Sequence, residues 1–157
     1  MSSSHWPRSW PEGMVRPRLR FEERQESGGS AIGLYSPHGF IEAHVGSPEY
    51  VSTHSYAYEQ PGLLGYIANN VRDTETIAYI DHVYVEEGRR SRGLGSHLMH
   101  RILHELRHRG AVRAFGHMAE WEGDARRRLE GWLRQFGFHV IDCCQEDQLP
   151  VVAVDLK

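Results

Sequence analysis

Residues 94–136 show the clearest hydrophobic periodicity in the chain. From residue 94 to 106, apolar side chains recur at spacings of three and four, which places them on one helical face, and Gly110 stands where such a helix would end. A second amphipathic pattern begins at Asp124, a residue type that caps helices, and ends before Gly137. We therefore predict two helices whose apolar faces pack on a sheet. The apolar positions are Leu94, Leu98, Met99, Ile102, Leu103 and Leu106 in the first helix and Ala125, Leu129, Trp132, Leu133 and Phe136 in the second.

The other regular segments are short, rich in β-branched and aromatic residues, and separated by Gly, Pro and Ser. No amphipathic helix is evident between residues 19 and 60, and residues 63–70 and 76–85 are expected to pair as a hairpin through the polar turn between them. This order of elements favours a mixed α/β fold. The predicted strands are 18–21, 31–35, 40–45, 50–59, 63–70, 76–85, 111–118, 138–144 and 150–157.

Length and composition are those of one ordinary folded domain. The 157 residues are 39% hydrophobic and 25% charged, which is close to the average of globular proteins. Residues 1–18 differ, because they are rich in Ser, Pro and Arg and contain two isolated tryptophans, Trp6 and Trp10. We expect a flexible tail over 1–18 and a single domain over 19–157. The alternative is that the tryptophans dock on that domain or on a second subunit of a homodimer.

Charge and cysteine content narrow the classes of function. The formal net charge of −3 gives no general reason to expect DNA, RNA or an anionic membrane as a partner. The two cysteines, Cys143 and Cys144, are adjacent, which suits neither a disulfide framework nor a zinc site. No apolar run is long enough to span a membrane and the N-terminus lacks a signal-peptide pattern. We expect a cytoplasmic protein that needs no metal.

The segment 83–97 places an apolar run before three arginines and two glycines, where a predicted strand turns into a helix. Gly93 and Gly95 allow the backbone to approach a ligand closely, and the first N–H groups of the helix carry the positive end of its dipole. The arginines at 89, 90 and 92 add charge, so a phosphate-bearing ligand is the natural guest. A plain tight turn with solvated arginines is the alternative. The P-loop pattern fails because no Lys follows the glycines, and the dinucleotide pattern fails because Leu98 replaces its third glycine.

What remains is the pattern V-x-x-x-x-R-x-x-G-x-G, which begins at Val85. With it the sequence resembles the GCN5-related N-acetyltransferases (GNAT), in which such a loop holds the pyrophosphate of coenzyme A (CoA). The resemblance runs from about residue 62 to the C-terminus and includes the Gly-Phe pair after the second helix. It implies the α/β GNAT fold, in which a mixed, mostly antiparallel, twisted sheet is flanked by helices. The same resemblance implies direct transfer of an acetyl group from acetyl-CoA to an amine. It also implies that the pantetheine arm contacts Val83, Tyr84 and Val85 and that the pyrophosphate lies on Arg90, Ser91, Arg92, Gly93, Leu94, Gly95 and Ser96.

The candidates for the base that takes a proton from the amine are His117, Asp81 and Glu120. His117 aligns with a position where some GNAT relatives carry Glu, and histidine titrates in the useful pH range. Asp81 lies on the strand before the loop, where relatives often have a carboxylate. By alternation we expect it to share a face with Val83 and Val85, with His82 on the opposite face. For each candidate, the alternative is a polar strand residue satisfied by its neighbours.

The acid that would protonate the departing thiolate is missing from its usual place, because Leu133 occupies the position of the family's tyrosine. Tyr79, Tyr84 or water could take its role. The absence also favours a second hypothesis, a non-catalytic CoA-binding regulatory or interaction module. A third hypothesis, an enzyme that modifies a nucleobase amine, has only the local arginines in its favour. The acceptor stays open, since two helices help to form the acceptor site in relatives, whereas we expect residues 19–60 to form strands.

Four histidines, His97, His100, His104 and His108, recur at spacings of three and four on the first predicted helix. Because their arc lies opposite the leucine face, we expect a solvated polar surface, with adventitious metal binding as the alternative. Arginines 126–128 spread around the second helix, which predicts a solvated surface more than a patch for nucleic acid.

Overall fold

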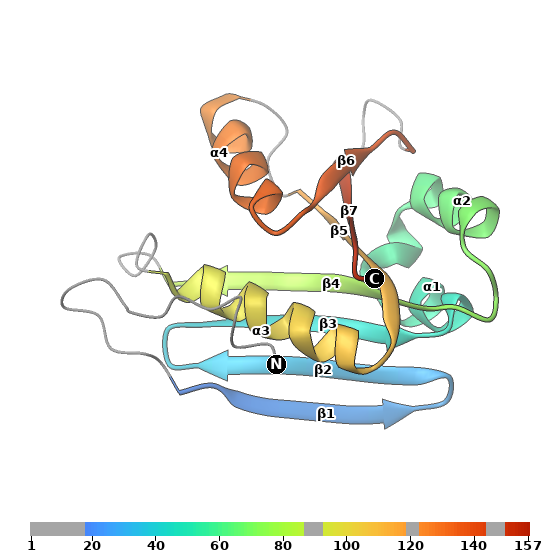
Figure 1. Ribbon diagram of the computed structural model, residues 1–157, viewed down its shortest axis with the longest axis horizontal. Helices are drawn as coiled ribbons and strands as arrows, with labels where there is room; N and C mark the ends of the chain where they lie inside the picture. The colour runs from blue at the N-terminus through green and yellow to red at the C-terminus, as the bar shows by residue number, and fades with distance from the viewer. Residues whose placement is uncertain (1–17, 87–92, 119–122, 144–149) are drawn as a thin grey trace.

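The computed structural model describes residues 18–86, 93–118, 123–143 and 150–157. Within them, one seven-stranded sheet has the strand order β1-β2-β3-β4-β5-β7-β6 (Figure 1). Neighbouring strands pair antiparallel, except that β4 and β5 are parallel. The predicted mixed, mostly antiparallel α/β fold is confirmed. The strands are β1 (Arg20–Glu26), β2 (Gly29–Ser36), β3 (Gly39–Gly46), β4 (Thr76–Val85), β5 (Ala111–His117), β6 (His139–Ile141) and β7 (Val151–Asp155).

Strands β1, β2 and β3 form a meander over the segment where the sequence predicted three strands. Gly28, with a φ of 92°, joins β1 to β2 in a left-handed conformation that glycine adopts without steric cost. Along β3, side chains alternate: Ile41 and Ala43 belong to the core, whereas Glu42 and His44 line a groove on the other face. One face of the meander is therefore apolar, and the other is polar.

The segment between β3 and β4 is helical, so the strands predicted at 50–59 and 63–70, and the hairpin built on them, are wrong. The expected absence of helices from 19–60 holds only as far as the end of β3. The three helices in this segment are α1 (Pro48–His54), the 3-10 helix η2 (Tyr56–Glu59) and α2 (Pro61–Asn70).

Local capping and burial explain why these β-rich residues form helices. The Ser47 hydroxyl accepts a hydrogen bond from the backbone N–H of Tyr50, and Pro48 occupies the first turn, where its missing N–H costs nothing. Pro61 begins α2 in the same way. Tyr50 and Val51 are buried against the sheet, so burial outweighs their intrinsic preference for strands.

Strand β4 pairs with β3 along its length but with β5 only at its beginning. The parallel register with β5 starts at Thr76 and ends at Tyr79, and the residues that the structure describes beyond this point show no further pairing between the two strands. Both strands nevertheless continue, β4 to Val85 and β5 to His117. The two strands therefore diverge, and one edge of β4 is left open.

A β-bulge interrupts β4 at Asp81. In β3, Glu42 pairs with His82 and the next residue, Ala43, pairs with Ile80, so Asp81 is the extra residue. A bulge of this kind shifts the alternation of side chains along the rest of the strand.

The shift overturns the expected faces of β4. Val85 packs against the core beneath α3, whereas Tyr79 belongs to the core on the opposite face of the sheet. Asp81 lies on that opposite side, where it contacts His44, so it does not share a face with Val85.

Helices cover both faces of the sheet. Helix α3 (Leu94–His108) lies across β2, β3 and β4 on one face (Figure 1), and its leucines join the larger core. Helices α1 and α2 contribute to a second core on the opposite face, around Phe115. Helix α4 (Gly123–Arg134) and α3 are the two helices that the periodicity predicted. Gly110 and Gly137 follow them with positive φ of 83° and 95°, as their predicted places at the helix ends require.

Candidate active site

The divergence of β4 and β5 opens a cavity of about 220 Å³, which we call the cleft. Its lining is mostly apolar and includes Met99 of α3 and Trp132 and Leu133 of α4. Gly116 and His117 of β5 form the opposite wall. A small apolar space of this kind suits the thin, largely uncharged arm of a ligand.

Helix α3 begins beside the cleft with a backbone suited to an anion. Gly93 precedes it with a φ of 87°, and Gly95 lies close to Trp132 and Val85, so that a Cβ there would be 3.5 Å from each. The Ser96 hydroxyl accepts a hydrogen bond of 3.0 Å from the Trp132 indole, which ties α4 to the start of α3. The first turn of α3 thus presents N–H groups next to the cleft.

The residues predicted to hold CoA lie in different surroundings. Val83 lines the cleft, while Tyr84 is half-exposed and packs at a tilt against Phe40, at 5.6 Å between ring centroids. Leu94 is buried in the core, so only its backbone is available to a ligand. The other residues at the start of α3, Gly93, Gly95 and Ser96, lie beside the cleft as described. Arg90, Ser91 and Arg92 lie outside the described residues, as does the catalytic candidate Glu120.

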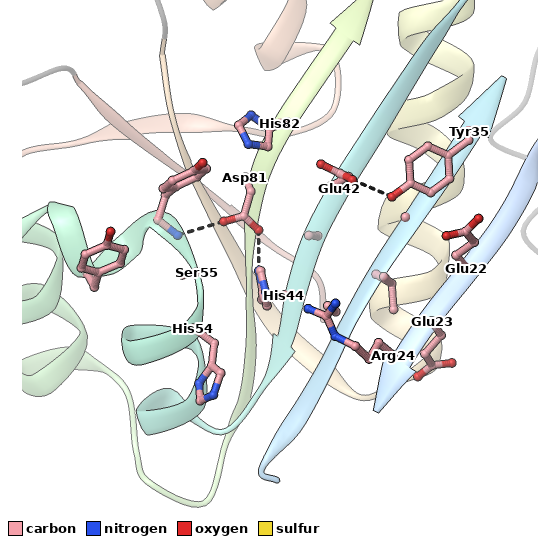
Figure 2. Close-up of a pocket in the computed structure, with 16 residues that line it drawn as sticks. Glu22, Glu23, Arg24, Tyr35, Glu42, His44, His54, Ser55, Asp81 and His82 are labelled. Carbon is pink, nitrogen blue, oxygen red and sulfur yellow. Dashed lines mark hydrogen bonds and ion pairs between the residues drawn. The ribbon is translucent and has the colours of Figure 1, made fainter. Parts of the chain in front are cut away.

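A larger cavity of about 660 Å³, which we call the groove, lies over the polar face of β1, β2 and β3 (Figure 2). It is bounded on one side by α1 and η2, from which His54 and Tyr56 contribute. Asp81 and His82 line the groove and also the cleft. The two cavities therefore meet at the bulge of β4, and the sequence prediction that Asp81 and His82 point to opposite sides is wrong in this respect.

Asp81 is held in place by two hydrogen bonds. Its Oδ2 lies 2.6 Å from Nδ1 of His44, and its Oδ1 accepts a hydrogen bond of 2.9 Å from the backbone N–H of Tyr56 (Figure 2). Asp81 is only 8% exposed. A buried carboxylate beside an imidazole can orient that ring and accept a proton through it.

Sequence reasoning missed His44. It stands in a strand of alternating apolar and polar residues, on the polar face of β3. That alternation could have placed it opposite the core. Its contact with Asp81 depends on the pairing of β3 with β4 and on the bulge, which no local pattern reveals.

His117 lies on the cleft wall and pairs with a tyrosine. Its Nδ1 is 2.6 Å from the hydroxyl of Tyr79, which is fully buried. Burial, and to a smaller extent the neighbouring His82, lower the pKa of His117, so the ring is neutral at neutral pH. A neutral imidazole that accepts from Tyr79 at Nδ1 carries its own proton on Nε2.

The remaining features singled out in the sequence do not form a metal site. His97 is 3% exposed, so the prediction that all four histidines of α3 face solvent is wrong at this position. His100 packs edge-on against Phe136, at 4.8 Å between ring centroids. Among the described residues, no three His, Cys, Asp or Glu side chains are grouped so that they could hold a metal ion. None of the described helices is long and apolar enough to cross a membrane.

The profile of the Acetyltransferase (GNAT) family matches residues 4–138 of the chain. The chain belongs to the GNAT acetyltransferase family. The matched range therefore includes most of residues 1–18, whose composition differs from that of the rest of the chain. It also includes strands β1, β2 and β3 and helices α1 to α4. Family membership makes the protein one of a group of acyltransferases.

A solved structure shares the fold. FeeM, an N-acyl amino acid synthase from uncultured soil microbes, is similar with a TM-score of 0.52 at 11% sequence identity, over 90% of this chain and 92% of that chain. An agmatine N-acetyltransferase is similar with a TM-score of 0.48 at 14% identity, over 78% of this chain and 71% of that chain. No curated protein matches the sequence at a significant level.

Proposed function

We propose that this protein transfers an acetyl group from acetyl-CoA to an amine, in a complex that holds both substrates at once. The observation that carries the proposal is the meeting of the cleft and the groove at Asp81 and His82. A donor in the cleft and an acceptor in the groove would approach each other from two sides of β4. Such an arrangement orients two reactants without a covalent enzyme intermediate.

The residues around the cleft fit acetyl-CoA. The first turn of α3, opened by Gly93, offers N–H groups and the positive end of the helix dipole to the pyrophosphate. Met99, Trp132 and Leu133 offer apolar contacts to the acyl arm. Gly116 leaves space in the cleft wall that a larger side chain would fill. When bound there, acetyl-CoA supplies the thioester that the amine attacks.

On the groove side, the Asp81–His44 pair is placed to take a proton from the amine. The backbone N–H of Tyr56 holds one oxygen of Asp81, which leaves the other to orient the His44 ring. Asp81 was predicted as a base from its strand position. The contact with His44 adds a second group that can hold the proton.

On the cleft side, Tyr79 and His117 together can supply a proton to the departing thiolate. As Nε2 of the neutral His117 ring gives its proton to the sulfur, Nδ1 takes the proton of the Tyr79 hydroxyl, so that Tyr79 is the net acid and His117 passes the proton on. The Tyr79 hydroxyl, 2.6 Å from Nδ1, favours the tautomer with the proton on Nε2. In this assignment His117 acts as a proton donor and not as the predicted base. The pair would take the role of the family's usual tyrosine, whose position is occupied by Leu133 in this chain.

The test is a two-part measurement on purified protein. Calorimetry with acetyl-CoA and free CoA should detect binding, and a thiol-release assay over amines, peptides and nucleic acid should detect turnover of at least one amine. Binding without thiol release from any acceptor would overturn the proposed transfer and support a CoA-binding module. Salt-sensitive binding of DNA or RNA, with release only on nucleic acid, would support nucleobase modification instead.

A further inference from the structure

One row of residues crosses the floor of the groove from β1 to β4. The register pairs Glu22 with Gly33, Gly33 with Glu42, and Glu42 with His82. Directly paired residues on one face of antiparallel strands have Cβ atoms about 5 Å apart. Glu42 is therefore the neighbour of His82, and His82 with Asp81 forms the junction of groove and cleft.

Glu42 is held in a defined position by Tyr35. The Tyr35 hydroxyl donates a hydrogen bond of 2.6 Å to Oε2 of Glu42 (Figure 2). The Tyr35 ring reaches Glu42 by lying over Gly33, where a Cβ would come within 2.5 Å of the hydroxyl oxygen. Burial, and then the hydrogen bond to Glu42, raise the pKa of Tyr35 to about 12, so the hydroxyl keeps its proton. Tyr35 thus satisfies one oxygen of Glu42 without bringing a positive charge.

The two arginines nearest Glu42 pair with other carboxylates, and one of them, Arg20, also lies over the Tyr35 ring at 5.2 Å from its centroid. Arg24 pairs with Glu26 at 3.5 Å, and Arg20 pairs with Glu22 at 2.8 Å. Within the part of the chain that the structure describes, no cationic side chain lies within ion-pair distance of Glu42. A carboxylate that faces a cavity with a neutral donor and no cation is suited to bind a cationic ligand group.

We propose that Glu42 binds a second cationic nitrogen of the acceptor, so that the acceptor is a short linear diamine or polyamine. This inference rests on the proposed acyl transfer. The reacting nitrogen lies at Asp81 and His82, next to the cleft. The second nitrogen lies one strand away on Glu42, which is the spacing that a chain of a few methylene groups spans. The groove, at about 660 Å³, has room for such a chain.

The experiment compares putrescine with n-butylamine, which has the same four-carbon chain but a single nitrogen. Thiol release from acetyl-CoA gives the KM of each amine, and calorimetry without acyl donor gives the Kd of each. For the wild-type chain, both constants should be about tenfold lower or more for putrescine, as one charge-assisted hydrogen bond provides. In Glu42→Gln, whose amide oxygen can still accept from Tyr35, this preference should fall toward one. The matched control is Glu49→Gln, an exposed carboxylate on α1 outside the groove lining, which should keep the preference.

The outcomes separate this inference from the proposed function. Equal constants for the two amines, or an unchanged preference in Glu42→Gln, would overturn the diamine assignment even if thiol is released. Acetylation of lysine peptides without binding of putrescine would do the same. Binding of putrescine that depends on Glu42, without thiol release from any amine, would uphold the site on Glu42 and count against acyl transfer.

Discussion

The cleft and the groove differ in size, polarity and origin, although they share Asp81 and His82. The cleft, about 220 Å³, is mostly apolar and is built from β4, β5, α3 and α4. The groove, about 660 Å³, carries acidic, basic and aromatic side chains from residues 22–58 and from the bulge of β4. The first is made by the segments that carried the resemblance in the sequence and the second mainly by the segment before them, and the GNAT family match over residues 4–138 includes the whole lining of the groove. In the proposed reaction, donor and acceptor recognition are thus divided between two parts of the chain.

The largest effect is expected when the cleft is filled while the groove is left intact. A Cβ at Gly116 would meet its nearest neighbours at 3.6–4.0 Å, which is ordinary contact, so alanine fits but a longer side chain must enter the cleft. Gly116→Leu should weaken acetyl-CoA binding by about a hundredfold or more, as measured by calorimetry on folded protein. Gly116→Ala is the matched control and should bind nearly as the wild type does. Wild-type affinity in a folded Gly116→Leu protein would place the acyl arm elsewhere.

An intermediate effect is expected on the groove side of the junction. His44 lines the groove but not the cleft, so His44→Gln should lower kcat by about ten- to a hundredfold and leave the Kd for acetyl-CoA unchanged. His54→Gln, in the same groove, is the comparison and should lower kcat less. Steady-state thiol-release kinetics on both variants measure the difference in kcat. If His44→Gln weakened acetyl-CoA binding by as large a factor as it lowered kcat, the two cavities would not bind their ligands separately.

The smallest effect concerns the stability of the cleft wall. The folded state lowers the pKa of His117 below its ordinary value of 6.5, mainly by burial, so below that pH the unfolded chain binds more protons than the folded chain. The wild type should therefore lose stability as pH falls through about 6.5, and His117→Gln should lose less. Urea unfolding at two pH values on either side of 6.5 measures the difference. His108→Gln, at an exposed histidine, serves as the control. If His117→Gln lost as much unfolding free energy between the two pH values as the wild type does, the lowered pKa of His117 would not be the cause.

The parts of the fold that were predicted correctly are those with a long, regular pattern. Helix α3 has seven buried positions within fifteen residues, and β7 begins with four apolar residues, all of them buried. Helix α1 escaped prediction because it is only seven residues long and contains Tyr50, Val51 and Thr53, which favour strands. The only local sign of a helix there is Ser47 followed by Pro48, a cap and a first-turn proline.

The same division applies to the candidate site. The glycine pattern located the start of α3, and the predicted strand 111–118 located His117. Both predictions depend only on residues that are near one another in sequence. The contacts of Asp81 could not, since a single bulge reverses the alternation that the prediction relied on. The contact between Tyr35 and Glu42 depends on the pairing of β2 with β3 and on the space above Gly33, so it becomes visible only in three dimensions.

Because side chains alternate along β3, the groove can be altered without changing the core on which α3 packs. Ile41 and Ala43 support α3 from one side of the strand, while Glu42 and His44 face the groove from the other. In the proposed reaction, selection of variants at the groove-facing positions alone would therefore change which acceptor is used and leave the core and the cleft unchanged.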